Sequence, residues 1–434
     1  MLITAAQTAA QAPMGIRECM QYAVENSTKI AAEDERINEY SIERRDALLN
    51  AFTPSVNASV GVMASSGRIP DPGTNINSTL KTIQDSYQIR SEITLFNGFN
   101  AVNRIKIAKI ALLTGKESRE AKEDEICLQT IQQFYHYTYY SKMSALAQLQ
   151  TDNAALSLQR VMREYELGNK SQQDVLEKEV FEAQAQYTFA EYNAQKNKAL
   201  MELKKVMFYP ADQNLAIDTV INADYIAEPS DVAATAQTAV EANSATVSAK
   251  NTLEIRQLEL KTARWQMLPS IGVEAGWSTY HSYYPDNSGM SASFRDDFKN
   301  NAKKYIGIGV NIPLYNRLSR VSNISRKKAE YKIASYEYDE KLREIENAVY
   351  AAYDDALSAE KSLLAAKKSA ELNQKFFDAA QRKFELGTIS YIDYNEVYNN
   401  YLESQAKYYN ALFDYRIKNA VVDYYRGKAY LEQF

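Results

Sequence analysis

The sequence predicts a mainly α-helical fold with a small β part, built from long coiled-coil helices and four short strands, and internally duplicated. Three observations predict it. Gly and Pro are scarce, at 14 and 9 of 434 residues, as expected for long helices. Four stretches of about ten residues alternate apolar and polar side chains, which is typical of strands. One phrase, Arg-(Glu/Lys)-(Tyr/Phe)-Glu-Leu-Gly, ends at Gly168 and again at Gly387, which indicates a duplication.

The chain is expected to consist of a leader, two repeats and one segment between them. Residues 1–12 are small and apolar and end in Ala-Gln-Ala, which resembles the end of a secretory signal peptide, although a basic start is missing. The first repeat is expected over 13–208 and the second over 240–434. A mixed segment, 209–239, separates the repeats.

The first repeat begins with a helix over 14–50 that Pro54 ends, because proline disrupts a helix interior. Two strands follow, at about 54–64 and 86–96. In both, aliphatic side chains alternate with polar ones, so each strand has one apolar and one polar face. A polar loop is expected between them, over about 65–83.

The second repeat follows the same order. A helix over 240–268 ends at Pro269, and strands are expected at about 269–279 and 304–314. The connecting loop, about 280–303, is long, polar and rich in Tyr. Because the order of elements is repeated, the two halves are expected to share one architecture.

Each repeat then continues into one long helical run, over 98–168 and 317–387. At 1.5 Å per residue each run could reach roughly 105 Å. In the second run, small and apolar residues recur at alternating spacings of three and four, which predicts coiled-coil packing. Shorter helices are expected to return over about 171–208 and 390–428.

The turn between the long and the returning helix is the most distinctive feature of each repeat. Gly168 and Gly387 follow the last periodic residue, where glycine takes a left-handed conformation easily. Asp174 and Asp393 come six residues later, where a helix N-terminus favours negative charge. The sequence therefore predicts two helical hairpin tips, at residues 165–174 and 384–393.

The four strands impose a physical requirement. About ten residues suffice to cross a bilayer as a tilted strand, whereas no window of about twenty apolar residues exists that could cross as a helix. Four strands cannot close a barrel, which needs about eight, and open strand edges are not tolerated in lipid. Strands in a membrane would therefore require several chains in one barrel.

Composition argues against several other classes. The net charge of −5 argues against a nucleic-acid partner. The two cysteines, Cys19 and Cys127, make no metal motif, and the two histidines, His136 and His281, stand apart in the sequence. No phosphate loop, nucleophile elbow or zinc helix occurs. We therefore expect no enzyme activity, no cofactor and no metal site.

The ordered set of Pro-stopped strands, exit turns and Gly-tipped hairpins resembles the TolC-type outer-membrane efflux proteins over about residues 14–430. The resemblance implies a homotrimer whose twelve strands close one barrel in the outer membrane, above an α-helical tunnel in the periplasm. The mixed segment 209–239 and the termini would form an equatorial collar. A periplasmic adaptor protein, and through it an inner-membrane pump, would be the partners.

The same resemblance suggests roles for residues at the tips. In the family, acidic side chains after the second tip glycine form a ring at the tunnel mouth, and the matching residues here are Asp393 and Glu396, with Asp174 and Glu177 in the first tip. Such a ring would attract cations. The residues alone favour a simpler role, in which the aspartates cap helices and the glutamates are solvated.

Closure of the mouth is expected to differ from the family pattern. The family's charged lock uses an Arg and a Tyr where this chain has Ile389 and Phe384, while Asp174 is retained. Closure is therefore expected to rest on apolar packing by Phe384, Ile389 and Tyr165. The exposed turns are expected to dock the adaptor through Leu167, Gly168, Asn169, Leu386, Gly387 and Thr388.

The sequence thus predicts a passive outer-membrane exit duct of a tripartite efflux or type I secretion system. The alternative is an elongated coiled-coil spacer or adhesin stalk of the cell envelope, which would need the heptads but neither amphipathic strands nor two matched tips. A soluble α+β enzyme is a third possibility, but the sequence offers no catalytic site for it. Neither the cargo nor the class of pump follows from the residues.

Overall fold

The computed structural model describes residues 13–70, 76–220, 231–286 and 291–434. The chain divides into two compact units. The strand unit comprises Arg36–Gly115 and Ala249–Tyr338, and the helical unit comprises Met1–Glu35, Lys116–Ser248 and Asp339–Phe434. The signal-like segment 1–12 lies outside the described residues.

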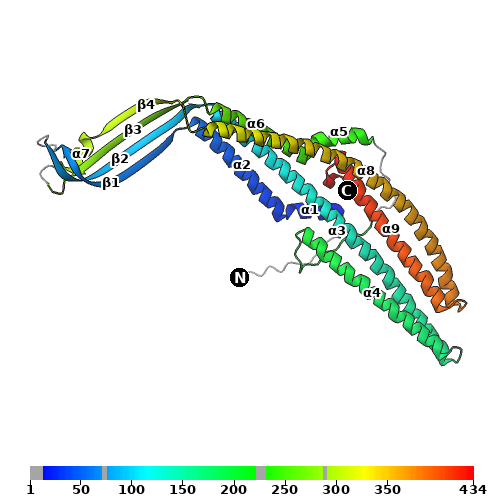
Figure 1. Ribbon diagram of the computed structural model, residues 1–434. Coiled ribbons are helices and arrows are strands. Elements are labelled where there is room, and N and C mark those ends of the chain that lie inside the picture. The colour runs from blue at the N-terminus through cyan, green and yellow to red at the C-terminus, as the bar shows by residue number, and fades with distance from the viewer. Residues whose placement is uncertain (1–12, 71–75, 221–230, 287–290) are drawn as a thin grey trace. The chain divides into compact units, whose positions relative to one another are not determined.

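The strand unit contains one four-stranded antiparallel sheet in the order β1-β2-β3-β4 (Figure 1). Its strands are β1 (Ser55–Pro70), β2 (Asn77–Asn97), β3 (Ser270–Tyr283) and β4 (Lys303–Asn311). The sheet joins the strands of both repeats, because β2 of the first pairs with β3 of the second. In the single chain β1 and β4 are therefore edge strands.

The first two strands are longer than the sequence predicts. Most of the polar loop expected over 65–83 is strand, since β1 and β2 stay paired up to Pro70 opposite Asn77. Backbone hydrogen bonds between two strands can continue where neither face carries an apolar pattern, so alternation underestimates the length. The rest of that loop, 71–75, lies outside the described residues.

The second strand pair differs in two other ways. β4 ends at Asn311 rather than at about 314, two residues before Pro313, which has no N–H to donate to a ladder. The loop expected over 280–303 contains a short helix, α7 (Phe294–Asn300), which Ser293 caps. Residues 287–290 of this loop are outside the described part.

The registers place the aliphatic side chains of all four strands on one face. Val60 lies opposite Tyr87, Ile89 opposite Trp277, and Ala275 opposite Ile306. Much of this face is exposed, including Val56, Val60, Val62, Ile89, Ile306, Ile308 and Val310. The other face carries polar groups, among them an ion pair between Arg90 and Glu274. The predicted division into an apolar and a polar face is therefore present.

Besides α7, four helices contribute to the strand unit: α2 (Thr28–Phe52), α3 (Asn100–Glu166), α6 (Ser244–Trp265) and α8 (Ser319–Glu385). The helix expected over 14–50 is in fact two helices, α1 (Ile16–Glu25) and α2. The break falls at Ser27, whose hydroxyl accepts hydrogen bonds from the N–H groups of Lys29 and Ile30 and so starts a new helix.

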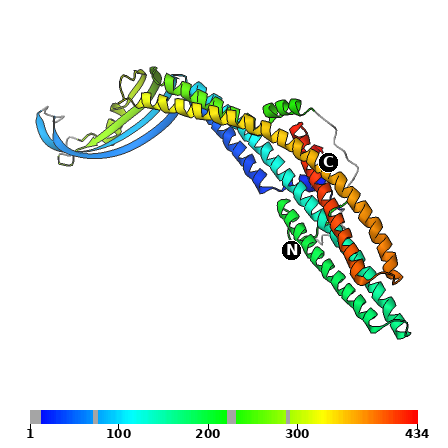
Figure 2. The same cartoon turned by 45° about the vertical axis from the view of Figure 1, so that its right-hand side comes forward.

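The helical unit contains two antiparallel hairpins, one of α3 and α4 (Gln172–Val206) and one of α8 and α9 (Tyr391–Tyr425), which lie side by side (Figures 1 and 2). A short helix, α5 (Val232–Ala242), and a 3₁₀ turn, η2 (Tyr430–Glu432), complete it. The mixed segment expected over 209–239 thus already contains the start of a helix, while residues 221–230 lie outside the described part.

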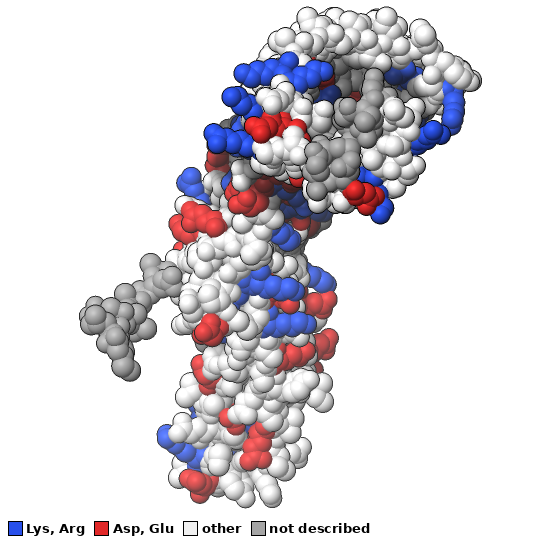
Figure 3. Space-filling model, turned by 90° about the vertical axis from the view of Figure 1, so that its left-hand side faces the viewer, with Lys and Arg blue, Asp and Glu red and all other residues white. Residues whose placement is uncertain are grey.

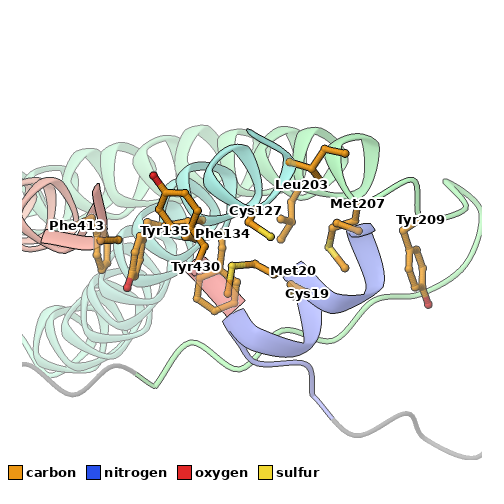
Figure 4. Close-up of a cluster of buried hydrophobic side chains, with 14 of the residues drawn as sticks. Cys19, Met20, Cys127, Phe134, Tyr135, Leu203, Met207, Tyr209, Phe413 and Tyr430 are labelled. Atoms are coloured by element: carbon orange, nitrogen blue, oxygen red, sulfur yellow. The ribbon is translucent and has the colours of Figure 1, made fainter. Parts of the chain in front are cut away.

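One hydrophobic core of the helical unit gathers side chains from α1, α2, α3, α4, α8, α9 and η2, and Figure 4 shows part of it. Both cysteines lie in it, Cys19 on α1 and Cys127 on α3, and both are free. Burial raises the pKa of each thiol to about 12, so neither is a reactive thiolate at neutral pH. The cysteines act here as small core residues.

The coiled-coil spacing of α8 corresponds to its buried side. Its buried apolar residues in the helical unit follow intervals of three, four and seven: Ile345, Val349, Ala356, Ala359, Leu363, Ala370, Phe377, Ala380 and Phe384. Because alanine dominates the middle of this series, the neighbouring helices can approach closely there.

Candidate functional site at the helical tips

The first tip is built by hydrogen bonds within one turn. The N–H of Gly168 donates to the Tyr165 carbonyl at 2.9 Å, and the N–H of Asn169 donates to the Glu164 carbonyl at 2.8 Å. Gly168 has φ +79°, the left-handed conformation that closes such a helix end. The turn is therefore fixed by its own backbone.

The second tip repeats this geometry. The N–H groups of Gly387 and Thr388 donate to the carbonyls of Phe384 and Lys383 at 3.1 and 2.9 Å, and Gly387 has φ +69°. The Lys170 ammonium of the first tip lies beside Gly387, 3.9 Å from where a Cβ would stand. The two predicted tips are thus adjacent within one chain.

Both aspartates of the predicted acidic ring take part in helix capping. The N–H of Asp174 donates to the Ser171 hydroxyl, and the Ser171 N–H donates back to Asp174 Oδ2 at 2.9 Å. These hydrogen bonds lower the pKa of Asp174. At the second tip the N–H of Asp393 donates to the Ser390 hydroxyl at 3.2 Å.

The two glutamates of the predicted ring lie one turn further along. Glu396 is exposed on α9, whereas Glu177 is half-buried on α4. Among the described residues neither makes an ion pair. In each tip the aspartate therefore has a structural partner, whereas the glutamate carboxylate forms no ion pair in the described part of the chain.

Directly behind the tips lies an aromatic cluster that joins both hairpins. Phe384 stacks on Tyr394 with ring centroids 4.3 Å apart, and Phe377 stacks on Tyr401 at 4.7 Å. Phe181 of α4 meets Phe384 edge-on at 6.0 Å, and this contact connects the two hairpins. The Gln150 amide of α3 donates to the Tyr394 hydroxyl at 3.2 Å.

A buried lysine completes this cluster. Lys178 on α4 places its ammonium 2.9 Å from the centre of the Phe384 ring, in a cation–π contact between the hairpins. Only 9% of the residue is exposed, and burial lowers its pKa to about 8, while the nearby Glu177 carboxylate opposes this shift. Burial therefore outweighs the favourable effect of the carboxylate on the charged form.

The residues predicted to close the mouth have different surroundings in the single chain. Phe384 is buried in the aromatic cluster and Ile389 packs against its edge, but Tyr165 is 46% exposed. The turns predicted to dock an adaptor carry two prominent apolar side chains, Leu167 and Leu386, which are 74% and 78% exposed.

Sequence reasoning missed Lys178, Phe181 and the buried tyrosines Tyr394, Tyr398 and Tyr401. These side chains recur every three or four residues on α4 and α9, a spacing that predicts a packed face. In a chain with 32 tyrosines this pattern does not distinguish buried rings from exposed ones.

Within the described residues no group of three His, Cys, Asp or Glu side chains is arranged to hold a metal ion. In the same part of the chain, no helix is both long and apolar enough to cross a membrane.

The chain is similar to known proteins in sequence pattern and in fold. Residues 235–423 match the outer membrane efflux protein family, which confirms the resemblance predicted from the sequence. Comparison with curated proteins gives no match.

The fold is that of solved outer-membrane channels. One match is a crystal structure of CusC, solved in a study of its folding and transmembrane channel formation. The TM-score is 0.74 and the identity 13%, and the match covers 94% of this chain and 91% of the CusC chain. The CmeC outer membrane channel of Campylobacter jejuni has TM-score 0.74 and 15% identity, covering 96% and 86%. The outer membrane protein VceC of Vibrio cholerae has TM-score 0.72 and 10% identity, covering 96% of each.

Proposed function

We propose that this chain, which carries the outer membrane efflux protein pattern over residues 235–423 and the fold of outer-membrane channels, is the exit duct of a tripartite export system. Three copies would form one channel that carries small molecules or polypeptides from a pump to the exterior. The conduit would be passive, with energy supplied by an inner-membrane pump through a periplasmic adaptor.

The observation that carries this proposal is the four-stranded sheet with an exposed aliphatic face and two edge strands. An aliphatic face of this kind is stable against lipid, but the unpaired backbone groups of β1 and β4 are not. Pairing of β4 with β1 of a neighbouring copy would satisfy them. Three copies would give twelve strands, which is within the range that closes a barrel.

The helical tips would form the periplasmic end of this duct. Leu167 and Leu386 would anchor the adaptor, together with the adjoining residues Gly168, Asn169, Gly387 and Thr388. Near a threefold axis, Asp393 and Glu396, with Asp174 and Glu177, would form an acidic ring that favours cations. Packing of Phe384 and Ile389 would hold each tip in its closed position, and Tyr165 would reach a neighbouring copy.

The test is the mass and the pore conductance of the detergent-extracted protein, for the wild type and for Asp393→Asn/Glu396→Gln. The neutral isosteres keep an acceptor for the Ser390 cap, so a change reports charge and not folding. We expect a trimer with cation-selective current that loses this selectivity in the variant. Unchanged selectivity would remove the ring but keep the duct, and a non-conducting protein would favour the coiled-coil spacer.

A further inference from the structure

The short helix α7 lies on the apolar face of the sheet, near the ends of the strands away from the helices (Figure 1). Phe298 contacts Tyr87 of β2 and Trp277 of β3, with ring centroids 5.5 and 5.6 Å apart. Phe294 contacts the ring of His281 at 5.5 Å. Two aromatic side chains, one turn apart, thus fix one side of α7 to the sheet.

Polar contacts hold α7 in the same place and engage both of its carboxylates. The Asp297 carboxylate lies 3.0 Å from His281 Nδ1 and accepts the Ser282 N–H at 3.2 Å. Asp296 accepts the Ser293 hydroxyl at 2.6 Å. The Thr279 hydroxyl donates to the Phe298 carbonyl at 2.8 Å. The Asp297 carboxylate is therefore directed at the sheet, whereas Asp296 is exposed and caps the helix together with Ser293.

The basic side chains beside them have no such partner. Arg295 and Lys299, four residues apart on one flank of α7, are exposed, and so is Lys304 at the start of β4. Lys304 lies opposite Trp277 and so shares the face on which α7 packs. None of the three makes an ion pair within the part of the chain that the structure describes. Figure 3, viewed from this end of the strands, shows Lys and Arg side chains on both sides of this end, with a few Asp and Glu side chains among them.

These cations lie at one end of the aliphatic face of the sheet. Below Trp277, the same face of β3 continues through Ala275 and Val273 to Ile271, a distance of about 20 Å for six residues. The apolar band of an outer-membrane barrel is about 25 Å tall and is bordered by aromatic residues. α7, with Phe294, Phe298 and Trp277, therefore lies at the level where such a band ends and lipid headgroups begin.

We propose that Arg295, Lys299 and Lys304 bind the phosphate groups of an anionic lipid in the outer leaflet, whose acyl chains lie along the aliphatic face below. The inference rests on the proposed function, because it requires these strands to span the outer membrane. A lipid rather than free phosphate fits this surface, since the cations stand directly above apolar side chains that free phosphate would not contact. Basic side chains above an apolar surface are the usual means of binding anionic lipids.

The experiment counts lipid molecules bound to the detergent-extracted protein by native mass spectrometry. The probes are bisphosphorylated lipid A and zwitterionic phosphatidylcholine, and the variant is Arg295→Gln/Lys299→Gln/Lys304→Gln. We expect the wild type to prefer lipid A and the variant to bind it on the order of a hundredfold more weakly, at about fivefold per basic side chain. The control, Lys198→Gln/Lys361→Gln/Lys375→Gln, removes three exposed lysines from the long helices and should bind lipid A as the wild type does.

Several outcomes would overturn the inference: unchanged lipid A binding in the variant, an equal loss in the control, or full displacement of lipid A by millimolar inorganic phosphate. The charge-preserving variant Arg295→Lys/Lys299→Arg/Lys304→Arg should retain binding, which separates loss of charge from misfolding. Pore conductance of the same samples tests the duct. A conducting protein without lipid A preference would remove this inference alone, whereas a non-conducting protein would remove the proposed function.

Discussion

The two tips share one local design but differ in what surrounds them. Tyr165 and Phe384 occupy the same place in the repeated phrase, 219 positions apart, yet Tyr165 is 46% exposed and Phe384 only 8%. The position of the buried Lys178 is occupied in the second copy by Val397, and that of the buried Tyr394 by Val175 in the first. Duplication therefore preserved the turns, whereas the helices behind them diverged into complementary halves of one cluster.

The difference shows how two copies of one hairpin can be held together. The second hairpin supplies stacked rings from α8 and α9, and the first supplies Lys178 and Phe181 to cover them. The contact joins unlike surfaces, because the positions of Lys178 and Phe181 are occupied by Val397 and Asn400 in the second copy. If closure of the proposed mouth depends on this aromatic cluster, then closure depends on the residues that differ between the two hairpins.

Truncation of the two equivalent aromatic residues should destabilise the protein to very different extents. Phe384→Ala should lower the free energy of unfolding by about 3 kcal/mol or more, because it leaves a cavity among stacked rings. Tyr165→Ala should cost less than about 1 kcal/mol, because half of that side chain is already in water. Chemical denaturation of the detergent-extracted protein measures both, and equal losses would show that the asymmetry has no energetic meaning.

The pH dependence of stability tests the buried lysine. The pKa of Lys178 is about 8 in the folded chain and 10.5 in the unfolded one, so the unfolded state binds more protons between these values. Lys178 should therefore contribute a rise in stability of roughly 1–2 kcal/mol from about pH 7.5 to about pH 9.5. The buried thiols of Cys19 and Cys127 oppose this contribution, because they ionise in this window only in the unfolded chain, so the rise is measured as the difference between the wild type and a variant that lacks Lys178.

Lys178→Met should remove most of this rise while keeping the packing against Phe384. The matched control is Lys383→Met, because the Lys383 ammonium is exposed at the second tip and its loss should leave the rise intact. Denaturation midpoints across the pH range measure both variants. A rise that persists in Lys178→Met would assign it to another group.

The smallest expected effect is a difference in stability between the helix caps of the two tips. Asp174→Ala should cost a few tenths to about 1 kcal/mol more than Asp393→Ala, because only Asp174 also accepts the N–H of its capping serine. The lowered pKa of Asp174 means that this contribution is present above its unfolded pKa and is lost as pH falls through the folded one. The two variants should therefore converge in stability in strong acid, and a difference independent of pH would contradict the assignment.

The sequence by itself determined the features that depend on neighbouring residues. Gly168 and Gly387 end helices, Ser171 and Ser390 begin the next ones, and Pro54 and Pro269 separate helices from strands, since each effect acts within a few residues. The alternation of strand residues likewise placed the aliphatic face correctly, because side chains on a strand point to opposite faces in turn. The duplication followed from the constant spacing of these signals.

Only the tertiary structure decided which copy of each position is buried and how far the strands extend. Lys178 and Phe384 are 206 positions apart, and nothing near either residue indicates that their side chains meet. β1 and β2 exceed their apolar pattern because each forms hydrogen bonds with the other. α7 is held on β2 and β3 by the rings of Tyr87 and Trp277 and by the contact of its own Asp297 with His281. Burial and pairing depend on partners that the fold brings together, so the local sequence cannot specify them.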